Sequence, residues 1–171
     1  DMVVLQHEIP LETVHYVIEF CYEKGIKIVL NPAPAAAVPM EIIDKVTYVT
    51  PNEHEAVLIF GDKLSTEDLL RKYPEKLVIT QGSRGVSTCL KDGQILNVPA
   101  RKAQVVDTTG AGDTLNGAFS VQIAEGKAIE DALAYANVAA SLSTEKFGAQ
   151  TGIPTAEEVE TALKILNGES V

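Results

Sequence analysis

Residues 105–119 read Val-Val-Asp-Thr-Thr-Gly-Ala-Gly-Asp-Thr-Leu-Asn-Gly-Ala-Phe, and the rest of the chain is best interpreted outward from this stretch. The two valines predict the end of a strand, the threonines and glycines predict a turn, and the apolar spacing that follows predicts a helix. Each glycine in the first turn of a helix costs about 1 kcal/mol relative to alanine. We expect a ligand to offset that cost, since glycine lets backbone N–H groups approach an anion, most often a phosphate.

Asp113 follows these glycines. A carboxylate repels a phosphate bound beside it, so an acidic residue at this position indicates a separate function. Accepting the proton of an attacking hydroxyl is such a function, so Asp113 is the candidate general base. A plain strand-to-helix turn, in which Asp113 only complements the helix dipole, explains the same residues without a ligand. The stretch lacks the lysine of a Walker A loop, and Leu115 stands where a dinucleotide-binding fingerprint has its third glycine.

The composition is that of a folded protein, with 171 residues, of which 46% are apolar and 22% charged. We expect one domain over residues 1–171. The net charge of −10 argues against a nucleic-acid surface, where basic patches are typical. A phosphate-binding protein with this charge must obtain positive potential locally, from helix N-termini and bound cations.

The cysteines and the apolar runs favour a cytoplasmic protein. Cys21 and Cys89 have no metal-ligand spacing and are typical of buried thiols in a reducing compartment. No apolar run approaches the roughly 18 residues of a membrane span, and no charged-then-apolar leader opens the chain. We therefore expect neither a membrane nor a nucleic acid as partner.

Strands and helices alternate along the chain. Strands are predicted at 3–6, 27–30, 47–50 and 77–80, and helices at 10–25, 40–46, 53–60, 110–126, 129–142 and 155–166. A hairpin is predicted between 87–91 and 94–98, because Asp92-Gly93 is a common two-residue turn. This order predicts a doubly wound α/β fold, with a mostly parallel sheet covered by helices on both faces and an antiparallel margin.

Residues 107–114, Asp-Thr-Thr-Gly-Ala-Gly-Asp-Thr, closely resemble the C-terminal signature of the ribokinase family of sugar and nucleoside kinases, also called the PfkB family. Four more stretches agree with that family, occur in its order and extend the resemblance over nearly the whole chain. They are Leu-Asn-Pro-Ala-Pro-Ala at 30–35, Thr-Pro-Asn-Glu-His-Glu-Ala at 50–56, Thr-Gln-Gly-Ser-Arg-Gly-Val at 80–86 and Phe-Gly-Ala-Gln-Thr-Gly-Ile-Pro at 147–154. The first and last of these are closer to ribokinase than to its relatives.

The resemblance implies a kinase that uses ATP and Mg²⁺, with Asp113 as base and the N–H groups at Gly110, Ala111 and Gly112 as an anion hole. It also implies a set of nucleotide contacts at Asn52, Thr80, Gly82, Ser83, Gly85, Gly112 and Asn137. Asn52 and Glu55 would hold Mg²⁺ and its water, although the same pair is a generic capping box. Asn137 has an ordinary polar helix position as its alternative explanation. Glu8, just beyond the first strand, and Asp113 would contact the sugar; for Glu8 the alternative is a solvated loop acid.

A monovalent-cation site, K⁺ in this family, is implied near Asp107. The family uses one carboxylate and several backbone carbonyls, which correspond here to Asp107 with Thr109, Ser143, Lys146, Gly148 and Gly152. At the last of these positions the family often has a hydroxyl side chain, and this chain has glycine. That departure puts one ligand in doubt.

The chain begins with Asp1, and Val3-Val4-Leu5 already has the pattern of a strand, so it looks like the C-terminal half of such a kinase without the lid. Three functions stay open. The first is ATP-dependent phosphorylation of a sugar primary hydroxyl, ribose being favoured over the substrates of fructokinase-like or nucleoside kinases. The second is a nucleotide-binding half that is not catalytic by itself. The third, a nicotinamide-dependent oxidoreductase, is disfavoured by the missing third glycine. Family members dimerise largely through the lid, so a homodimer is expected of the full-length protein.

Overall fold

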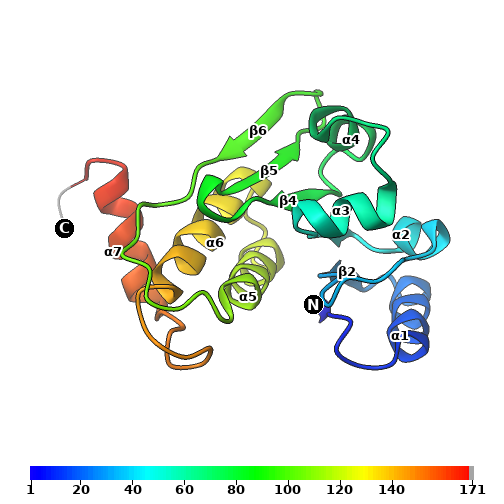
Figure 1. The fold of residues 1–171 in the computed structure, drawn as a ribbon, viewed down its shortest axis with the longest axis horizontal. Coiled ribbons are helices and arrows are strands. Elements are labelled where there is room, and N and C mark those ends of the chain that lie inside the picture. Colours follow the sequence, from blue (N-terminus) through cyan, green and yellow to red (C-terminus); the bar gives the residue numbers. More distant parts are fainter. Residues whose placement is uncertain (170–171) are drawn as a thin grey trace. The chain divides into compact units, whose positions relative to one another are not determined.

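The structure is a computed structural model that describes residues 1–169 (Figure 1). The chain falls into two compact units. Unit 1 comprises residues 1–81 and 86–97, and unit 2 comprises residues 82–85 and everything from Val98 onward. Each unit is described by itself.

Unit 1 contains six strands and four helices. In chain order they are β1 (Met2–Leu5), α1 (Leu11–Glu23), β2 (Lys27–Leu30), α2 (Met40–Lys45), β3 (Tyr48–Val49), α3 (Glu53–Phe60), α4 (Thr66–Lys72), β4 (Val78–Thr80), β5 (Val86–Cys89) and β6 (Ile95–Val98), whose last residue belongs to unit 2. Unit 2 contains a short 3₁₀ turn at Gly82–Arg84 and the helices α5 (Ala111–Ala124), α6 (Ile129–Ser143) and α7 (Ala156–Leu166).

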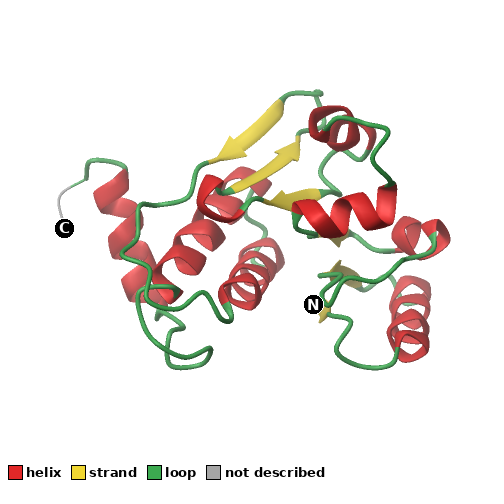
Figure 2. Ribbon diagram, in the orientation of Figure 1, coloured by secondary structure: helices red, strands yellow, loops and turns green. Residues whose placement is uncertain are grey.

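The strands of unit 1 form a parallel part and an antiparallel part, drawn in yellow in Figure 2. β1, β2 and β3 pair in parallel, with Val3 opposite Ile28 and Leu30 opposite Val49. Isolated parallel bridges from Val49 to Leu77 and from Asn52 to Thr80 continue this order to β4. β4 then pairs with β5 in antiparallel fashion, and β6 follows β5. The predicted parallel sheet with an antiparallel margin is confirmed.

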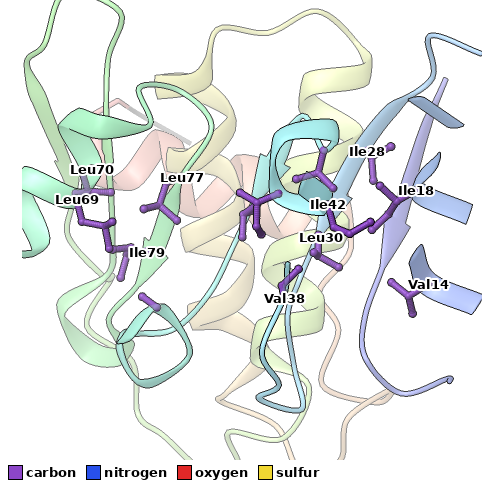
Figure 3. Close-up of a cluster of buried hydrophobic side chains, with 14 of the residues drawn as sticks. Val14, Ile18, Ile28, Leu30, Val38, Ile42, Leu69, Leu70, Leu77 and Ile79 are labelled. Carbon is purple, nitrogen blue, oxygen red and sulfur yellow. The ribbon is translucent and has the colours of Figure 1, made fainter. Parts of the chain in front are cut away.

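The core of unit 1 explains why these segments are strands and helices (Figure 3). The inward residues of α1 recur at helical spacing, and Val14 and Ile18 are fully buried. The β2 residues Ile28, Val29 and Leu30 are buried in succession, as expected of a strand covered on both faces. Burial of these side chains is the main favourable term in the stability of the unit.

Unit 2 is built around α6, which contacts both α5 and α7. Ala132, Ala136 and Ala139 of α6 are buried, and their small side chains let neighbouring helices approach closely. Val159 of α7 packs against Val138 of α6. This packing holds α5 and α7 against α6.

One predicted strand is absent. Residues 101–107 have no strand, and Val105 and Val106 are exposed by 61% and 59%. The N–H groups of Val106 and Asp107 both donate to the carbonyl of Thr144, at 2.7 Å and 3.1 Å. A strand needs a neighbouring ladder of backbone groups, and here a single carbonyl supplies the contact, so the prediction from the two valines was wrong.

Among residues 1–169 no helix is both long and apolar enough to cross a bilayer.

Candidate functional site

The start of α5 carries the residues on which the interpretation of the sequence depends. Gly110 is the N-cap and has a φ of +79°, a left-handed conformation that favours glycine. A Cβ on Gly110 would lie 3.1–3.2 Å from the backbone and side chain of Ala149. The chain itself therefore accounts for this glycine, and the contact with Ala149 had no signal in the sequence.

Gly112 differs from Gly110, because no contact within residues 1–169 requires a glycine at this position. A Cβ on Gly112 would meet no atom within 4 Å, and its φ is not positive. Glycine at this position costs the helix about 1 kcal/mol relative to alanine, and it leaves the surface of the helix N-terminus open. This is the arrangement in which a ligand outside the chain can come close to the backbone.

The N–H groups of the first turn divide into used and unused donors. Ala111 donates to Thr108 at 3.2 Å and Thr114 donates to Gly110 at 2.8 Å. No carbonyl or side chain of residues 1–169 accepts from Gly112 or Asp113. Of the residues 110–112 predicted to form the anion hole, Gly112 has an available N–H, and Asp113 provides a second one. Together with the positive end of the helix dipole, these two donors are of the kind that bind anions, and the anion hole stays a prediction.

Asp113 is exposed in the same turn, and the residues described here provide no hydrogen-bond or ion-pair partner for its carboxylate. One position further, the hydroxyl of Thr114 is buried without a hydrogen-bond partner in the described chain. The carboxylate is therefore open to an external donor such as a hydroxyl group.

Asp107 joins the turn before α5 to the loop after α6. Its Oδ1 accepts from the N–H of Thr109 and its Oδ2 from the N–H of Gly148, each at 2.9 Å. The hydroxyl and the N–H of Thr109, followed by the N–H of Gly148, hold the pKa of Asp107 below its usual range, against a small opposing effect of burial. The carboxylate thus stays charged at neutral pH.

The carbonyls of the predicted cation site converge on Gly152. A Cβ at this position would lie 2.7 Å from the oxygen of Ser143, 2.9 Å from that of Gly148 and 3.6 Å from that of Lys146. There is no room for the serine-like side chain that the family often has here. A set of carbonyl oxygens linked to one carboxylate is a hard donor set, which fits a cation such as K⁺. The other expected ligands are backbone oxygens and Asp107, which do not depend on a hydroxyl at position 152, and the K⁺ site stays a prediction.

The family resemblance predicts nucleotide contacts in the turn at 82–85. Gly82 and Ser83 are exposed in it, with Gly82 at a φ of +56°. Gly85 is buried, and a Cβ there would lie 2.0 Å from the oxygen of Val98 and 2.7 Å from the N–H nitrogen of Ala100. The backbone of residues 98–100 thus explains Gly85, whereas the nucleotide contact stays a prediction.

Asn137 lies on α6 with 4% of its surface exposed. Its Nδ2 donates to the carbonyls of Pro99 at 2.7 Å and Val98 at 3.2 Å. The side chain therefore anchors the segment that leaves β6. Its predicted place beside the adenine is an additional role that these contacts leave untested.

Asn52 and Glu55 form the predicted capping box at the start of α3, in unit 1. The N–H of Glu55 donates to Asn52 Oδ1 at 2.9 Å, and the N–H of Asn52 donates to Glu55 Oε2 at 2.8 Å. Thr80 is held nearby through its N–H bond to Pro51 and the bridge between Thr80 and Asn52. The capping box uses Oε2 of Glu55 and not Oε1. The predicted contact with hydrated Mg²⁺, which typically retains several waters and takes few protein ligands, stays a prediction.

Within residues 1–169 no group of three or more His, Cys, Asp or Glu side chains is arranged to hold a metal ion.

Glu8 is exposed in the loop after β1, at the carboxyl end of the strand where open α/β sheets bind ligands.

The ion pair between Arg101 and Glu145, with 2.8 Å between Nη1 and Oε1, was missed by the sequence interpretation. It ties residues 101–104 to the end of α6, and Glu145 also accepts from the N–H of Gln104 at 3.3 Å. The partners lie 44 positions apart, and no local pattern in a single sequence connects them.

Residues 2–156 match the pfkB family of carbohydrate kinases. The chain belongs to this family. It is 52% identical to a ribokinase of Bacillus subtilis over 163 residues, which cover 95% of this chain and 55% of the relative. A ribokinase of Lactococcus lactis is 49% identical over 167 residues, covering 97% of this chain and 55% of the relative. The resemblance to the family inferred from residues 107–114 is confirmed.

Solved structures agree. The crystal structure of a ribokinase from Thermotoga maritima matches with a TM-score of 0.84 at 36% identity, over 96% of this chain and 57% of that one. The structure of Arabidopsis thaliana ribokinase complexed with ribose and ATP matches with a TM-score of 0.85 at 30% identity, over 95% and 55%. The ribokinase-like fold is thus confirmed, and the chain spans about half the length of the curated relatives it matches.

Proposed function

We propose that the protein to which this chain belongs transfers the γ-phosphoryl group of ATP to the primary hydroxyl of a small sugar, with D-ribose as substrate and ribose 5-phosphate as product. The relatives of highest identity reported above are ribokinases, and one structural neighbour holds ribose and ATP. The observation that carries the proposal is the start of α5, where an unexplained Gly112 and two unused N–H donors adjoin the unpaired carboxylate of Asp113.

In the proposed reaction the sugar hydroxyl oxygen forms a bond to the γ-phosphorus while the bond from that phosphorus to the β,γ-bridging oxygen breaks, and ADP leaves. Asp113 accepts the hydroxyl proton as the new bond forms. The N–H groups of Gly112 and Asp113 stabilise the negative charge on the transferred group. Phosphoryl transfer needs mainly alignment and charge stabilisation, which a helix N-terminus supplies.

Cations complete the proposed site. Mg²⁺ with ATP would supply charge neutralisation on the phosphates, and Glu55 with Asn52 would hold its hydration shell. Asp107 and the carbonyls of Ser143, Lys146 and Gly148 would hold K⁺, and Asp107 links that region to the turn before α5 through Thr109. Asn52, Thr80, Gly82, Ser83, Gly85 and Asn137 would line the nucleotide, and Glu8 the sugar.

Two alternatives have a specific observation behind them. A deoxyribokinase of Salmonella typhimurium is 33% identical over 96% of this chain, so another sugar of the same class is the first. The second is a nucleotide-binding half that is not catalytic by itself, because the chain spans 55% of the length of its Bacillus subtilis relative.

The test is ADP release by the full-length protein with ribose, deoxyribose, fructose or a nucleoside as acceptor, in the presence of Mg²⁺ and K⁺. We expect the highest kcat/KM with ribose and formation of a monophosphate at the primary hydroxyl, seen by phosphorus NMR. ADP release that no acceptor stimulates would contradict the proposed function.

A further inference from the structure

His7 follows β1 and makes two contacts with the loop after β2, in unit 1. Its N–H donates to the carbonyl of Ala33 at 2.8 Å, and its Nδ1 lies 3.2 Å from the carbonyl oxygen of Pro34. Because a carbonyl only accepts, Nδ1 carries a proton. Just before these contacts, the N–H of Asn31 donates to Leu5 at 2.9 Å. We call His7 with Ala33 and Pro34 the His7 clamp.

The clamp joins loops at the carboxyl ends of two neighbouring parallel strands. This edge is where open α/β sheets place their ligands. Glu8, the proposed sugar contact, is the next residue after His7 and belongs to the same loop, which runs from β1 near the N-terminus to α1 (Figure 1). Two points of attachment on His7 therefore restrict where Glu8 can lie.

The ring of His7 is placed so that a positive charge on it is unfavourable. Its Nε2 is buried and has no hydrogen-bond partner in residues 1–169, and the same holds for Nε2 of His15 on α1. A protonated ring would bury a second N–H without an acceptor, which costs free energy. Burial is the main cause that lowers the pKa of His7; His15 lowers it further, while the carbonyl of Pro34 and the charge of Glu55 on α3 oppose the effect.

We propose that His7 is a positioning residue that holds the Glu8 loop against the 31–34 loop while its ring is neutral and releases it when the ring is protonated. Sugar affinity then falls in mild acid, in the pH range where histidine titrates. This inference rests on the proposed function, in which Glu8 contacts the sugar. The clamp is next to Glu8, the proposed sugar contact, so we expect the affinity for ATP to change less than the affinity for ribose.

The kinetic test uses the full-length protein and measures kcat and the KM values for ribose and ATP between about pH 8 and about pH 5.5. For the natural sequence we expect the KM for ribose to rise at least about fivefold, the lower end of typical coupling between sites. In His7→Gln this rise is absent. The matched control is His54→Gln, because His54 is exposed on α3, and this variant should follow the natural sequence.

A second measurement does not depend on activity. Hydrogen exchange reports the protection of the His7 amide, with the amide of Thr50, which donates to Leu30 at 2.9 Å, as the internal reference. We expect the ratio of the two protection factors to fall at least about tenfold on acidification in the natural sequence and to stay constant in His7→Gln. A constant ratio in the natural sequence, or the same pH dependence of the ribose KM in His7→Gln, would overturn the inference. A protein without sugar kinase activity would refute the proposed function, and the exchange measurement would still decide the clamp.

Discussion

At the scale of single residues, the two glycines at the start of α5 have different explanations. Gly110 adopts a positive φ and has Ala149 close to where a Cβ would lie, whereas Gly112 has an ordinary φ and open space where a side chain would be. The first is a requirement of the fold, and the second makes sense when a ligand approaches the helix N-terminus. Gly117, further along α5, also has open space and provides a control.

Gly112→Val is expected to weaken ATP binding at least about tenfold, because the side chain would occupy the approach to the two unused N–H donors. Gly117→Val has the same change in helix propensity outside that approach and should leave ATP affinity unchanged. Calorimetric titration of the full-length variants with ATP and Mg²⁺ measures both. Equal affinities for the two variants would mean that the turn at Gly112 is only structural.

Asp113→Asn keeps the size of the side chain and removes its basicity. We expect kcat to fall by roughly 10² to 10⁴, the usual contribution of a general base, with ATP affinity within a factor of about two. Steady-state kinetics and calorimetry on the same preparation separate the two effects. A variant that retains kcat within about tenfold of the natural protein would exclude Asp113 as the base.

Asp107 gives a prediction for pH. Its folded pKa is lowered from 3.8, chiefly by its bonds to Thr109, so the carboxylate stabilises the folded chain above the unfolded pKa, and this contribution is lost as the pH falls through the folded pKa. In Asp107→Asn the loss of Tm between about pH 5 and pH 3 should be less steep. The same variant is expected to lose activation by K⁺. Parallel acid profiles, or activity that never depended on K⁺, would contradict this role.

At the scale of elements, sequence patterns predicted those helices and strands whose signals are local. Asn52 with Glu55 marked the start of α3, and this capping box is present. The helix predicted to begin at 155 also starts with a capping box, formed by Thr155 and Glu158. The strand expected before Asp107 failed, since strand formation depends on a partner that Val105 and Val106 do not reveal. Likewise the packing of Gly85 against residues 98–100 is a tertiary contact, so the sequence could not separate it from a ligand contact.

A lysine with a structural role lies at the amino ends of the strands of unit 1. Lys76 precedes β4, and its Nζ donates to the carbonyls of Ile43 at 2.7 Å and Asp44 at 2.9 Å, near the end of α2. These carbonyls have no partner within the helix, so Lys76 supplies one. Burial lowers the pKa of this lysine, which Asp44 partly opposes.

Lys76→Met keeps the apolar stem and removes the two hydrogen bonds. We expect the free energy of unfolding to fall by about 1–3 kcal/mol, with the kinetic constants unchanged, because the site lies at the amino ends of the strands. Denaturation by urea measures the change in the full-length protein. Lys63→Met, at an exposed position before α4, is the control and should stay within about 0.5 kcal/mol of the natural sequence.

At the scale of the whole molecule, the sheet of unit 1 has an unpaired margin. β1 pairs with β2 on one side, and no strand within residues 1–169 pairs with its other side. Residues 2–5 read Met-Val-Val-Leu, an apolar segment with unpaired backbone groups. Such an edge is a template for association with another strand. In a protein of the length of the relatives, the preceding residues are the natural candidates to cover it.

The 171-residue chain purified alone is therefore expected to bind ATP weakly at best, to show no ribose-dependent ADP release and to aggregate. It contains the candidate phosphate site at Gly112 and the proposed base, but Glu8 is its single candidate sugar contact besides Asp113, and closure around a substrate is needed to exclude water during phosphoryl transfer. Light scattering, calorimetry with ATP and the ADP assay test these three expectations, with the full-length protein as the control. Ribose-dependent turnover at the rate of the full-length protein, by a chain whose mass corresponds to 171 residues, would show that the sequence described here is a complete kinase.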